Sequence, residues 1–113
     1  MYLRIALDYS ARDAIVHATR HLNGASKPSR NDFSHALARA VHESEPVSDV
    51  DLLIRTGGEQ RLSDFLLWEA AYAELYFTHR MWPDFGPTDL AAAVREFQGR
   101  ERRFGRVLEA VAG

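Results

Sequence analysis

A short segment near the middle of the chain combines residue types that bind anions. Between an apolar run at 51–54 and a longer one at 63–73, the chain carries two arginines and two glycines, and a serine opens the second run. These residues are Arg55, Gly57, Gly58, Arg61 and Ser63. Guanidinium groups donate paired hydrogen bonds to phosphate oxygens, glycines let backbone N–H groups approach a ligand, and a hydroxyl adds a further donor. The segment therefore predicts a site for a phosphate or a diphosphate.

The same segment also has a purely structural interpretation. In that interpretation the glycines adopt positive φ in a turn between a strand and a helix, the arginines lie on the surface, and Ser63 caps the helix that follows. The pattern RTGG at 55–58 is too short to separate the two interpretations.

Glu74 is a second candidate for chemistry because it lies between the apolar runs at 63–73 and 75–77. A carboxylate is costly to bury unless it is paired with a cation. Mg²⁺ that bridges phosphate oxygens is one such cation, and an arginine such as Arg55 or Arg61 is another. The residues by themselves favour the arginine.

The elements that must position these residues alternate between strands and helices. Short apolar runs predict strands, and apolar residues at helical spacing predict helices. The predicted strands are 3–7, 51–54 and 75–77, and the predicted helices are 11–22, 31–42, 63–73 and a last one that begins near 88. Asn31 or Asp32, Ser63, and Thr88 or Asp89 are the expected helix caps.

Strands joined through a helix pair in parallel with a right-handed connection, and ligands bind beyond their carboxyl ends. We therefore expect an α/β fold, with a three-layer parallel sheet of about three strands flanked by helices.

Composition restricts the class of protein more than its function. The 113 residues carry a net charge of −2 and no cysteine, which favours one globular domain and excludes a disulfide framework. The weak net charge does not favour nucleic acid as a partner. No apolar run is long enough for a transmembrane segment or a secretion signal, so we expect a cytoplasmic protein.

Two further groups of residues have ordinary explanations. His17 and His21 lie one helical turn apart and could bind a metal, but such a pair is more often a solvated face. The arginines near the C-terminus alternate with glutamates, which favours an ion-paired surface over a phosphate or nucleic-acid site.

Several long motifs resemble one family, the cis-prenyltransferases, of which undecaprenyl diphosphate synthase is the bacterial type. The motifs are LRIALDYSARDAIVHATRHL at 3–22, DLLIRTGGEQRLSDFLLWEAAYAELYF at 51–77, WPDF at 82–85 and RERRFG at 100–105. The resemblance implies condensation of isopentenyl diphosphate onto an allylic diphosphate, Mg²⁺ with the bound diphosphate, a six-stranded parallel sheet and usually a homodimer.

The resemblance also implies roles for particular residues. It implies that Glu74 takes part in the Mg²⁺ site, and that an RxG motif at Arg103 and Gly105 reaches the active site of a partner. The residues that it assigns to the substrate diphosphate are Arg55, Gly57, Gly58, Arg61, Ser63, Arg103 and Gly105.

The other half of the family pattern, including the DGNGRW-type loop for the allylic diphosphate, has no counterpart in this sequence. Residues that depart from the usual pattern are Asp8, Ser10, Ala11, Gln60 and Asp64. We expect 1–113 to be a single domain equivalent to the C-terminal half of an undecaprenyl diphosphate synthase. It would bind isopentenyl diphosphate and be active only with a separate N-terminal half, as a homodimer or heterodimer. A non-catalytic regulatory partner of a full-length enzyme and an inactive remnant are the alternatives.

Overall fold

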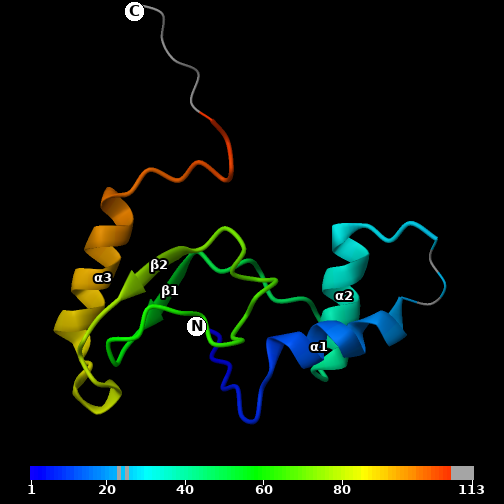
Figure 1. Ribbon diagram of the computed structural model, residues 1–113, viewed down its shortest axis with the longest axis horizontal. Coiled ribbons are helices and arrows are strands. Elements are labelled where there is room, and N and C mark those ends of the chain that lie inside the picture. The colour runs from blue at the N-terminus through cyan, green and yellow to red at the C-terminus, as the bar shows by residue number, and fades with distance from the viewer. Residues whose placement is uncertain (23, 25, 108–113) are drawn as a thin grey trace, which may run out of the picture. The chain divides into compact units, whose positions relative to one another are not determined.

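The computed structural model describes residues 1–22, 24 and 26–107, and the chain divides into two compact units. One unit comprises residues 1–48 and 62–69 and is called the helical unit. The other comprises residues 49–61 and the chain from 70 onwards and is called the sheet unit. The elements follow one another as α1 Ala11–Ala18, α2 Arg30–Ala40, β1 Leu52–Arg55, β2 Glu74–Phe77 and α3 Pro87–Gly99 (Figure 1).

In the helical unit, α1 and α2 each begin after a serine whose hydroxyl caps the helix. Ser10 accepts a hydrogen bond from the Asp13 N–H at 3.1 Å, and a 3₁₀ turn at Thr19–His21 extends the end of α1. At α2, Ser29 accepts from the Asp32 N–H at 3.0 Å while Asp32 accepts from the Ser29 N–H at 2.8 Å. This reciprocal capping box places the cap at Ser29, so the prediction of Asn31 or Asp32 was wrong.

Small residues form the core of the helical unit. Ala14, Ala18, Ala36 and Leu37 are buried between α1 and α2, which Figure 1 shows packed together. Because alanine has no side chain beyond Cβ, it allows the two helix backbones to approach closely.

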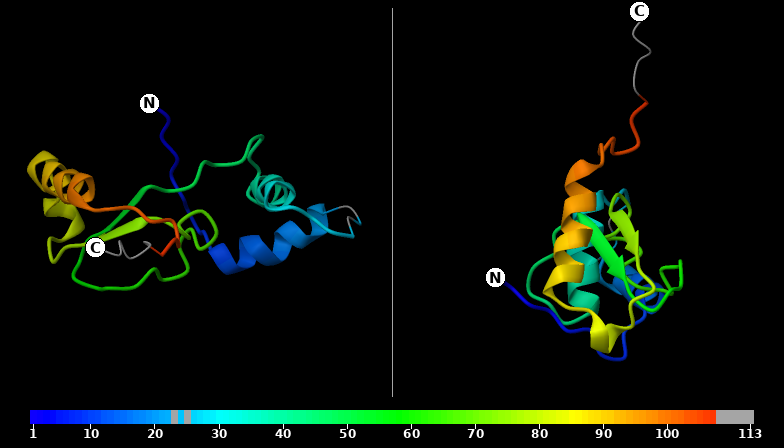
Figure 2. Two further views of the ribbon diagram at one scale, coloured as in Figure 1. Left: turned by 90° about the horizontal axis from the view of Figure 1, so that it is seen from above. Right: turned by 90° about the vertical axis from the view of Figure 1, so that its left-hand side faces the viewer.

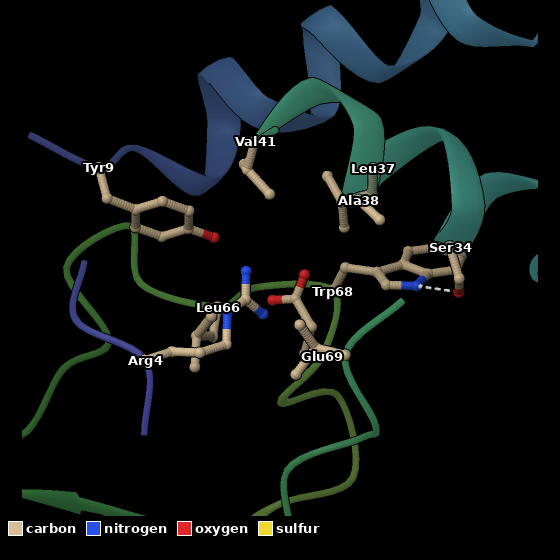
Figure 3. A pocket seen from close by; sticks show the side chains of 10 residues that line it. Arg4, Tyr9, Ser34, Leu37, Ala38, Val41, Leu66, Trp68 and Glu69 are labelled. Atoms are coloured by element: carbon tan, nitrogen blue, oxygen red, sulfur yellow. Dashed lines mark hydrogen bonds between the residues drawn. The ribbon is translucent and has the colours of Figure 1, made fainter. Parts of the chain in front are cut away.

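Trp68 closes one side of the helical core. Its ring centroid lies 4.6 Å from that of Phe33, and its Nε1 donates to the Ser34 hydroxyl at 3.1 Å. A cavity of about 40 Å³ remains beside it, into which Arg4, Tyr9 and Glu69 point (Figure 3). This volume is large enough for about one water molecule.

The sheet unit is built on a parallel pair of strands. The register pairs Leu52 with Glu74 and Arg55 with Phe77. Figure 2 shows α3 running alongside the strand pair. The helix begins with proline at its first position, where no N–H is needed, and the Asp89 carboxylate accepts from the Gly86 N–H at 2.9 Å. Thr88 and Asp89 therefore lie in the first turn rather than at the predicted cap position.

The predicted strand at 3–7 was wrong. This segment has no strand structure, and Leu3, Ile5 and Leu7 are 73–83% exposed. An apolar run only makes a strand when another strand satisfies its backbone groups. The right-handed crossover expected from it does not form either. The α/β class with a parallel sheet is confirmed, and the described residues supply two strands rather than about three.

The predicted helix at 63–73 was also wrong, because this segment forms a series of turns. Ser63, Asp64 and Leu66 have positive φ values of 50°, 62° and 51°, which a right-handed helix does not contain. A helix that is apolar all round needs cover on every side, and Phe65 and Tyr72 remain 41% and 46% exposed here. Ser63 therefore caps no helix.

No helix in the described ranges is long and apolar enough to cross a membrane. The expectation that 1–113 forms a single domain stays a prediction.

Candidate functional site

The two arginines of the predicted anion loop converge on one carboxylate oxygen. Arg55 ends β1, and its Nη2 donates to Glu59 Oε2 at 2.7 Å. Its Nη1 donates to the Arg61 carbonyl at 2.6 Å, which fastens the two ends of the loop. The Arg61 guanidinium lies 3.7 Å from the same Glu59 oxygen. The loop thus gathers two positive charges around a single anionic oxygen, at the carboxyl end of a strand.

Glu59 was missed in the sequence interpretation. The signal for it was an acid placed four residues after Arg55 and two before Arg61. Its side chain is 53% exposed and that of Arg61 is 66% exposed, so solvent and small anions can reach the pair. An exposed ion pair contributes little to stability, and exchanging its carboxylate for another anion therefore costs little.

The glycines of this loop shape its path. Gly57 and Gly58 have φ values of 90° and 85°, where residues with a side chain are strained. Their N–H groups donate to the carbonyls of Arg80 and Thr78, each at 2.9 Å. A Cβ at Gly58 would also lie 2.9 Å from the His79 ring. The glycine N–H groups are thus engaged with the segment after β2, so the guanidinium groups, of which that of Arg61 is 66% exposed, are the candidate donors of this loop.

Ser63 belongs to the helical unit, whereas Arg55 and Arg61 belong to the sheet unit. Its φ of 50° puts it in the left-handed region, as does that of its neighbour Asp64. Asp64 contacts the first turn of α1 through hydrogen bonds from Ser10 and Arg12.

Glu74 lies at the other end of the strand pair from the anion loop. It opens β2 opposite Leu52, whereas Arg55 closes β1 opposite Phe77. Three residues along a strand correspond to about 10 Å. The structure therefore does not bring Glu74 together with the loop.

The partner of Glu74 is Arg100, whereas Arg55 and Arg61 were the arginines considered from the sequence. Its Oε2 accepts from Arg100 Nη1 at 3.3 Å. Arg100 also donates to the Leu75 carbonyl at 2.8 Å and to Glu96 Oε1 at 2.6 Å. The hydrogen bonds to Glu96, and then to Glu74, raise the pKa of Arg100. Arg100 thus fixes the end of α3 to the beginning of β2.

The residues around Glu74 do not fit a resident Mg²⁺ site. Mg²⁺ favours one or two carboxylates together with phosphate oxygens and water. The Glu74 carboxylate is already held by a guanidinium, and no group of three or more histidine or acidic side chains in the described ranges could hold a metal ion. A metal at this position would depend on ligands that come with a substrate.

The RxG motif lies near Glu74 and away from the anion loop. Arg102 anchors it, donating to Asp51 at 2.7 Å and to the Tyr72 carbonyl at 3.2 Å, with its guanidinium 4.5 Å from the Phe104 ring centroid. Arg103 forms a 3.6 Å ion pair with Glu101, two residues earlier, and is 55% exposed, and Gly105 has φ 77°. The sequence interpretation grouped Arg102 with the surface arginines and missed its anchoring role.

The fold and this loop define a class: an α/β protein that carries an arginine-rich anion loop at the carboxyl end of a parallel strand. The family model for undecaprenyl diphosphate synthase matches residues 1–105. The chain belongs to this family of prenyltransferases.

The curated proteins to which this chain is similar include isoprenyl transferases. Isoprenyl transferase 1 of Bradyrhizobium diazoefficiens is 56% identical over 105 residues, which cover 93% of this chain and 41% of the relative. The isoprenyl transferase of Rickettsia typhi is 47% identical over 106 residues, covering 92% of this chain and 45% of the relative. The chain thus spans less than half the length of the curated relatives it matches.

Solved structures show the same relationship. A probable undecaprenyl diphosphate synthase from Campylobacter jejuni superposes with a TM-score of 0.68 at 34% identity, covering 89% of this chain and 46% of that one. Lavandulyl diphosphate synthase from Lavandula x intermedia, solved with dimethylallyl diphosphate, gives a TM-score of 0.74 at 34% identity and covers 89% of this chain and 45% of its own. The described fold is therefore part of a cis-prenyltransferase fold.

Proposed function

We propose that this chain supplies the isopentenyl diphosphate-binding half of a polyprenyl diphosphate synthase. The observation that carries the proposal is the convergence of Arg55 and Arg61 on one oxygen of Glu59. A diphosphate oxygen carries negative charge and accepts from guanidinium in the same way as a carboxylate, and more strongly when both groups share it. Glu59 would therefore hold the arginines in place until the diphosphate displaces it.

The proposed diphosphate ligands differ in how they would act. Arg55 and Arg61 would donate directly, and Gly57 and Gly58 would keep the loop in the shape that brings those arginines together. Ser63 would add its hydroxyl. Arg103 and Gly105 would contribute toward the site of a partner chain, since the Arg103 side chain is exposed.

Chain elongation needs a second diphosphate, on the allylic substrate, together with a group that favours its ionisation. The DGNGRW-type loop assigned to that task is not in this sequence, so we expect no elongation by the chain alone. A heterodimer with a cytoplasmic protein that carries the N-terminal half would complete the active site, whereas a homodimer of this chain would still lack the loop for the allylic diphosphate.

Mg²⁺ is proposed as a companion of the bound diphosphate rather than as a resident metal. Glu74 is the residue that the family resemblance assigns to it, but Arg100 holds that carboxylate in this structure. Any metal contact at Glu74 would have to share the carboxylate with Arg100, which donates to its Oε2.

The binding part of the proposal is tested by calorimetric titration of the 113-residue protein with isopentenyl diphosphate and Mg²⁺. Wild type should bind, and Arg55→Ala and Arg61→Ala should each lower the affinity by at least tenfold. Arg95→Ala is the matched control, because Arg95 is an exposed arginine of α3 outside the loop. Absence of binding by wild type would overturn the proposal.

The catalytic part is tested by incorporation of labelled isopentenyl diphosphate into polyprenyl products. The chain should be inactive alone and active when mixed with the N-terminal part of the Bradyrhizobium diazoefficiens relative. Turnover by the isolated chain would contradict the proposed dependence on a second half.

The exposed Arg103 also favours a second candidate function, that of a non-catalytic partner of a full-length enzyme. In that case the chain would change the rate of an intact synthase and fail to complement an N-terminal half. A chain with neither effect would be an inactive remnant.

A further inference from the structure

The backbone of the segment directly after β2 is paired with that of the anion loop. The N–H groups of Gly57 and Gly58 donate to the carbonyls of Arg80 and Thr78, each at 2.9 Å. The Thr78 N–H donates in turn to the Arg55 carbonyl at 3.0 Å. All of these residues belong to the sheet unit. The path of the loop therefore depends on a segment about twenty residues further along the chain.

The His79 side chain adds a contact of a different kind between the same two segments. A Cβ placed on Gly58 would lie 2.9 Å from His79 Nδ1, and its three nearest neighbouring atoms would all belong to this imidazole. A Cβ on Gly57 would meet nothing within 4 Å. The imidazole therefore lies directly against one glycine of the loop and leaves the other in open space.

The segment that carries His79 is also anchored on its far side. The Arg80 guanidinium donates through Nε to Asp89 Oδ1 at 3.2 Å, and the Arg80 N–H donates to the Thr78 hydroxyl at 3.1 Å. The other oxygen of Asp89 accepts from the Gly86 N–H at 2.9 Å, at the beginning of α3. The imidazole thus projects from a segment that is tied to the first turn of a helix.

The shape of the loop decides whether its two arginines meet at one point. Arg55 and Arg61 are six residues apart, and both reach the same oxygen of Glu59. Gly58 lies midway between them in the chain and has φ 85°. Because glycine has more backbone conformations open to it than any other residue, rotation at this position would move one guanidinium away from the other. An imidazole packed on Gly58 removes part of that freedom.

We infer that His79 is a positioning residue for the substrate diphosphate, whose imidazole restricts the anion loop to the shape in which Arg55 and Arg61 converge. The inference rests on the proposed function and adds to it a residue from outside the loop. His79 acts through Gly58 and does not contact the diphosphate. Its contribution is a smaller loss of conformational entropy in the loop when the ligand binds.

The first test is the affinity of the 113-residue protein for isopentenyl diphosphate with Mg²⁺, measured by calorimetry. His79→Ala should lower the affinity by about fivefold, because the loop must then be ordered by the ligand. His79→Asn should recover most of this loss, since asparagine can place its Cγ and one amide atom where Cγ and Nδ1 of the imidazole lie. A loss as large in His79→Asn as in His79→Ala would overturn the positioning role.

The contact itself is tested by combining His79→Ala with substitutions of the two glycines. With His79 present, Gly58→Ala should weaken binding more than Gly57→Ala, because only the first brings a Cβ against the ring. With His79→Ala, the two glycine variants should weaken binding equally. Such non-additivity is the signature of residues in contact. The same difference between Gly57→Ala and Gly58→Ala in both backgrounds would contradict the inference.

Asp32→Ala is the control for general loss of stability. It removes the capping box of α2 in the helical unit, so it should lower the melting temperature and leave the affinity unchanged. If Asp32→Ala weakens binding as much as His79→Ala, the effect is general instability and the positioning role is overturned.

The outcomes also separate this inference from the proposed function. If wild type binds, Arg61→Ala weakens binding and His79→Ala binds as wild type does, the positioning role fails and the proposed function stands. If wild type does not bind, the proposed function fails and the inference fails with it. His79 is exposed, so its truncation should leave the fold intact. Should His79→Ala nevertheless not fold, equal affinities of Gly57→Ala and Gly58→Ala would overturn the inference.

Discussion

Arginines gather at two places in the sheet unit, and their surroundings differ. At the carboxyl end of β1, the Arg61 guanidinium is 66% exposed and its partner Glu59 is 53% exposed. Near the beginning of the strands, Arg100 and Arg102 are 32% and 21% exposed and donate to backbone carbonyls as well as to acids.

Arg61 can exchange its partner for a ligand at little cost, whereas releasing Arg100 or Arg102 would leave strand and turn carbonyls without donors. Arg55 is intermediate, since it is 24% exposed and donates to the Arg61 carbonyl. The exposure of the acidic partner does not separate the two groups, because Asp51 is 73% exposed beside Arg102; the exposure of the arginine itself and its bonds to backbone carbonyls do.

The largest difference between the two groups of arginines should appear in substrate affinity. Arg55→Ala should weaken binding of isopentenyl diphosphate by about 30-fold, because a hydrogen-bonded charge contributes about 2 kcal/mol. Arg102→Ala should leave the affinity within about twofold of wild type. Calorimetric titration measures both, and equal losses would mean that the two groups of arginines do not differ in function.

For the free energy of unfolding, we expect the opposite order, with the larger loss in the group near the beginning of the strands. Arg102→Ala removes contacts to Asp51, the Tyr72 carbonyl and the Phe104 ring, and should lower the free energy of unfolding by about 2 kcal/mol. Arg61→Ala should change it by less than about 0.5 kcal/mol, as is usual for an exposed ion pair. Urea unfolding is the measurement. Arg102→Lys is a useful control, since it keeps the charge but loses the fork of donors and should recover only part of the loss.

Substitution of the glycines of the anion loop should have a smaller effect, which acts through the shape of the loop. Gly57→Ala and Gly58→Ala both place a side chain at positive φ, which costs about 1 kcal/mol. A Cβ at Gly57 meets open space, whereas one at Gly58 lies 2.9 Å from the His79 ring. Gly58→Ala should therefore be the more destabilising of the two and should weaken isopentenyl diphosphate binding more. Identical melting temperatures and affinities for the two variants would show that contact with His79 plays no part.

The smallest effect that we expect is that of acid on stability near neutral pH. It should act through carboxylates that lie outside both groups of arginines. The pKa values of Asp64 and Asp89 lie below their ordinary value of 3.8, chiefly because the Ser10 hydroxyl and the Gly86 N–H donate to them. A carboxyl with a lowered pKa in the folded state stabilises above its unfolded pKa, and this contribution disappears as the pH falls through the folded value.

Stability should therefore be level above about pH 5 and fall below the ordinary carboxyl pKa of 3.8. Asp64→Asn and Asp89→Asn should each make the acid limb of a pH–stability curve shallower. A curve unchanged in both variants would show that these hydrogen bonds do not favour the charged form.

Sequence patterns predicted the positions of three helices and two strands. The helices at α1, α2 and α3 and the strands at β1 and β2 all lie where apolar spacing indicated them. Their caps were less predictable. Ser29 and Gly86 precede the residues expected at the caps of α2 and α3, because several nearby polar residues could each cap a helix and only the backbone path selects one.

The two elements that failed depend on distant partners. Residues 3–7 have strand composition but no neighbouring strand, and residues 63–73 have a helical pattern but adopt left-handed conformations at Ser63, Asp64 and Leu66. Periodicity reports which residues prefer burial, but it does not report whether a surface exists to bury them.

The sequence by itself determined the family, the residue types of the anion loop and their order along the chain. Only the tertiary structure decided which charge meets which: Glu59 with Arg55 and Arg61, Glu74 with Arg100, and Asp64 with the beginning of α1. The physical reason is that spacing along the chain sets which groups are available. Pairing between them depends instead on strand register and on where a turn returns the backbone, and these are properties of the folded chain as a whole.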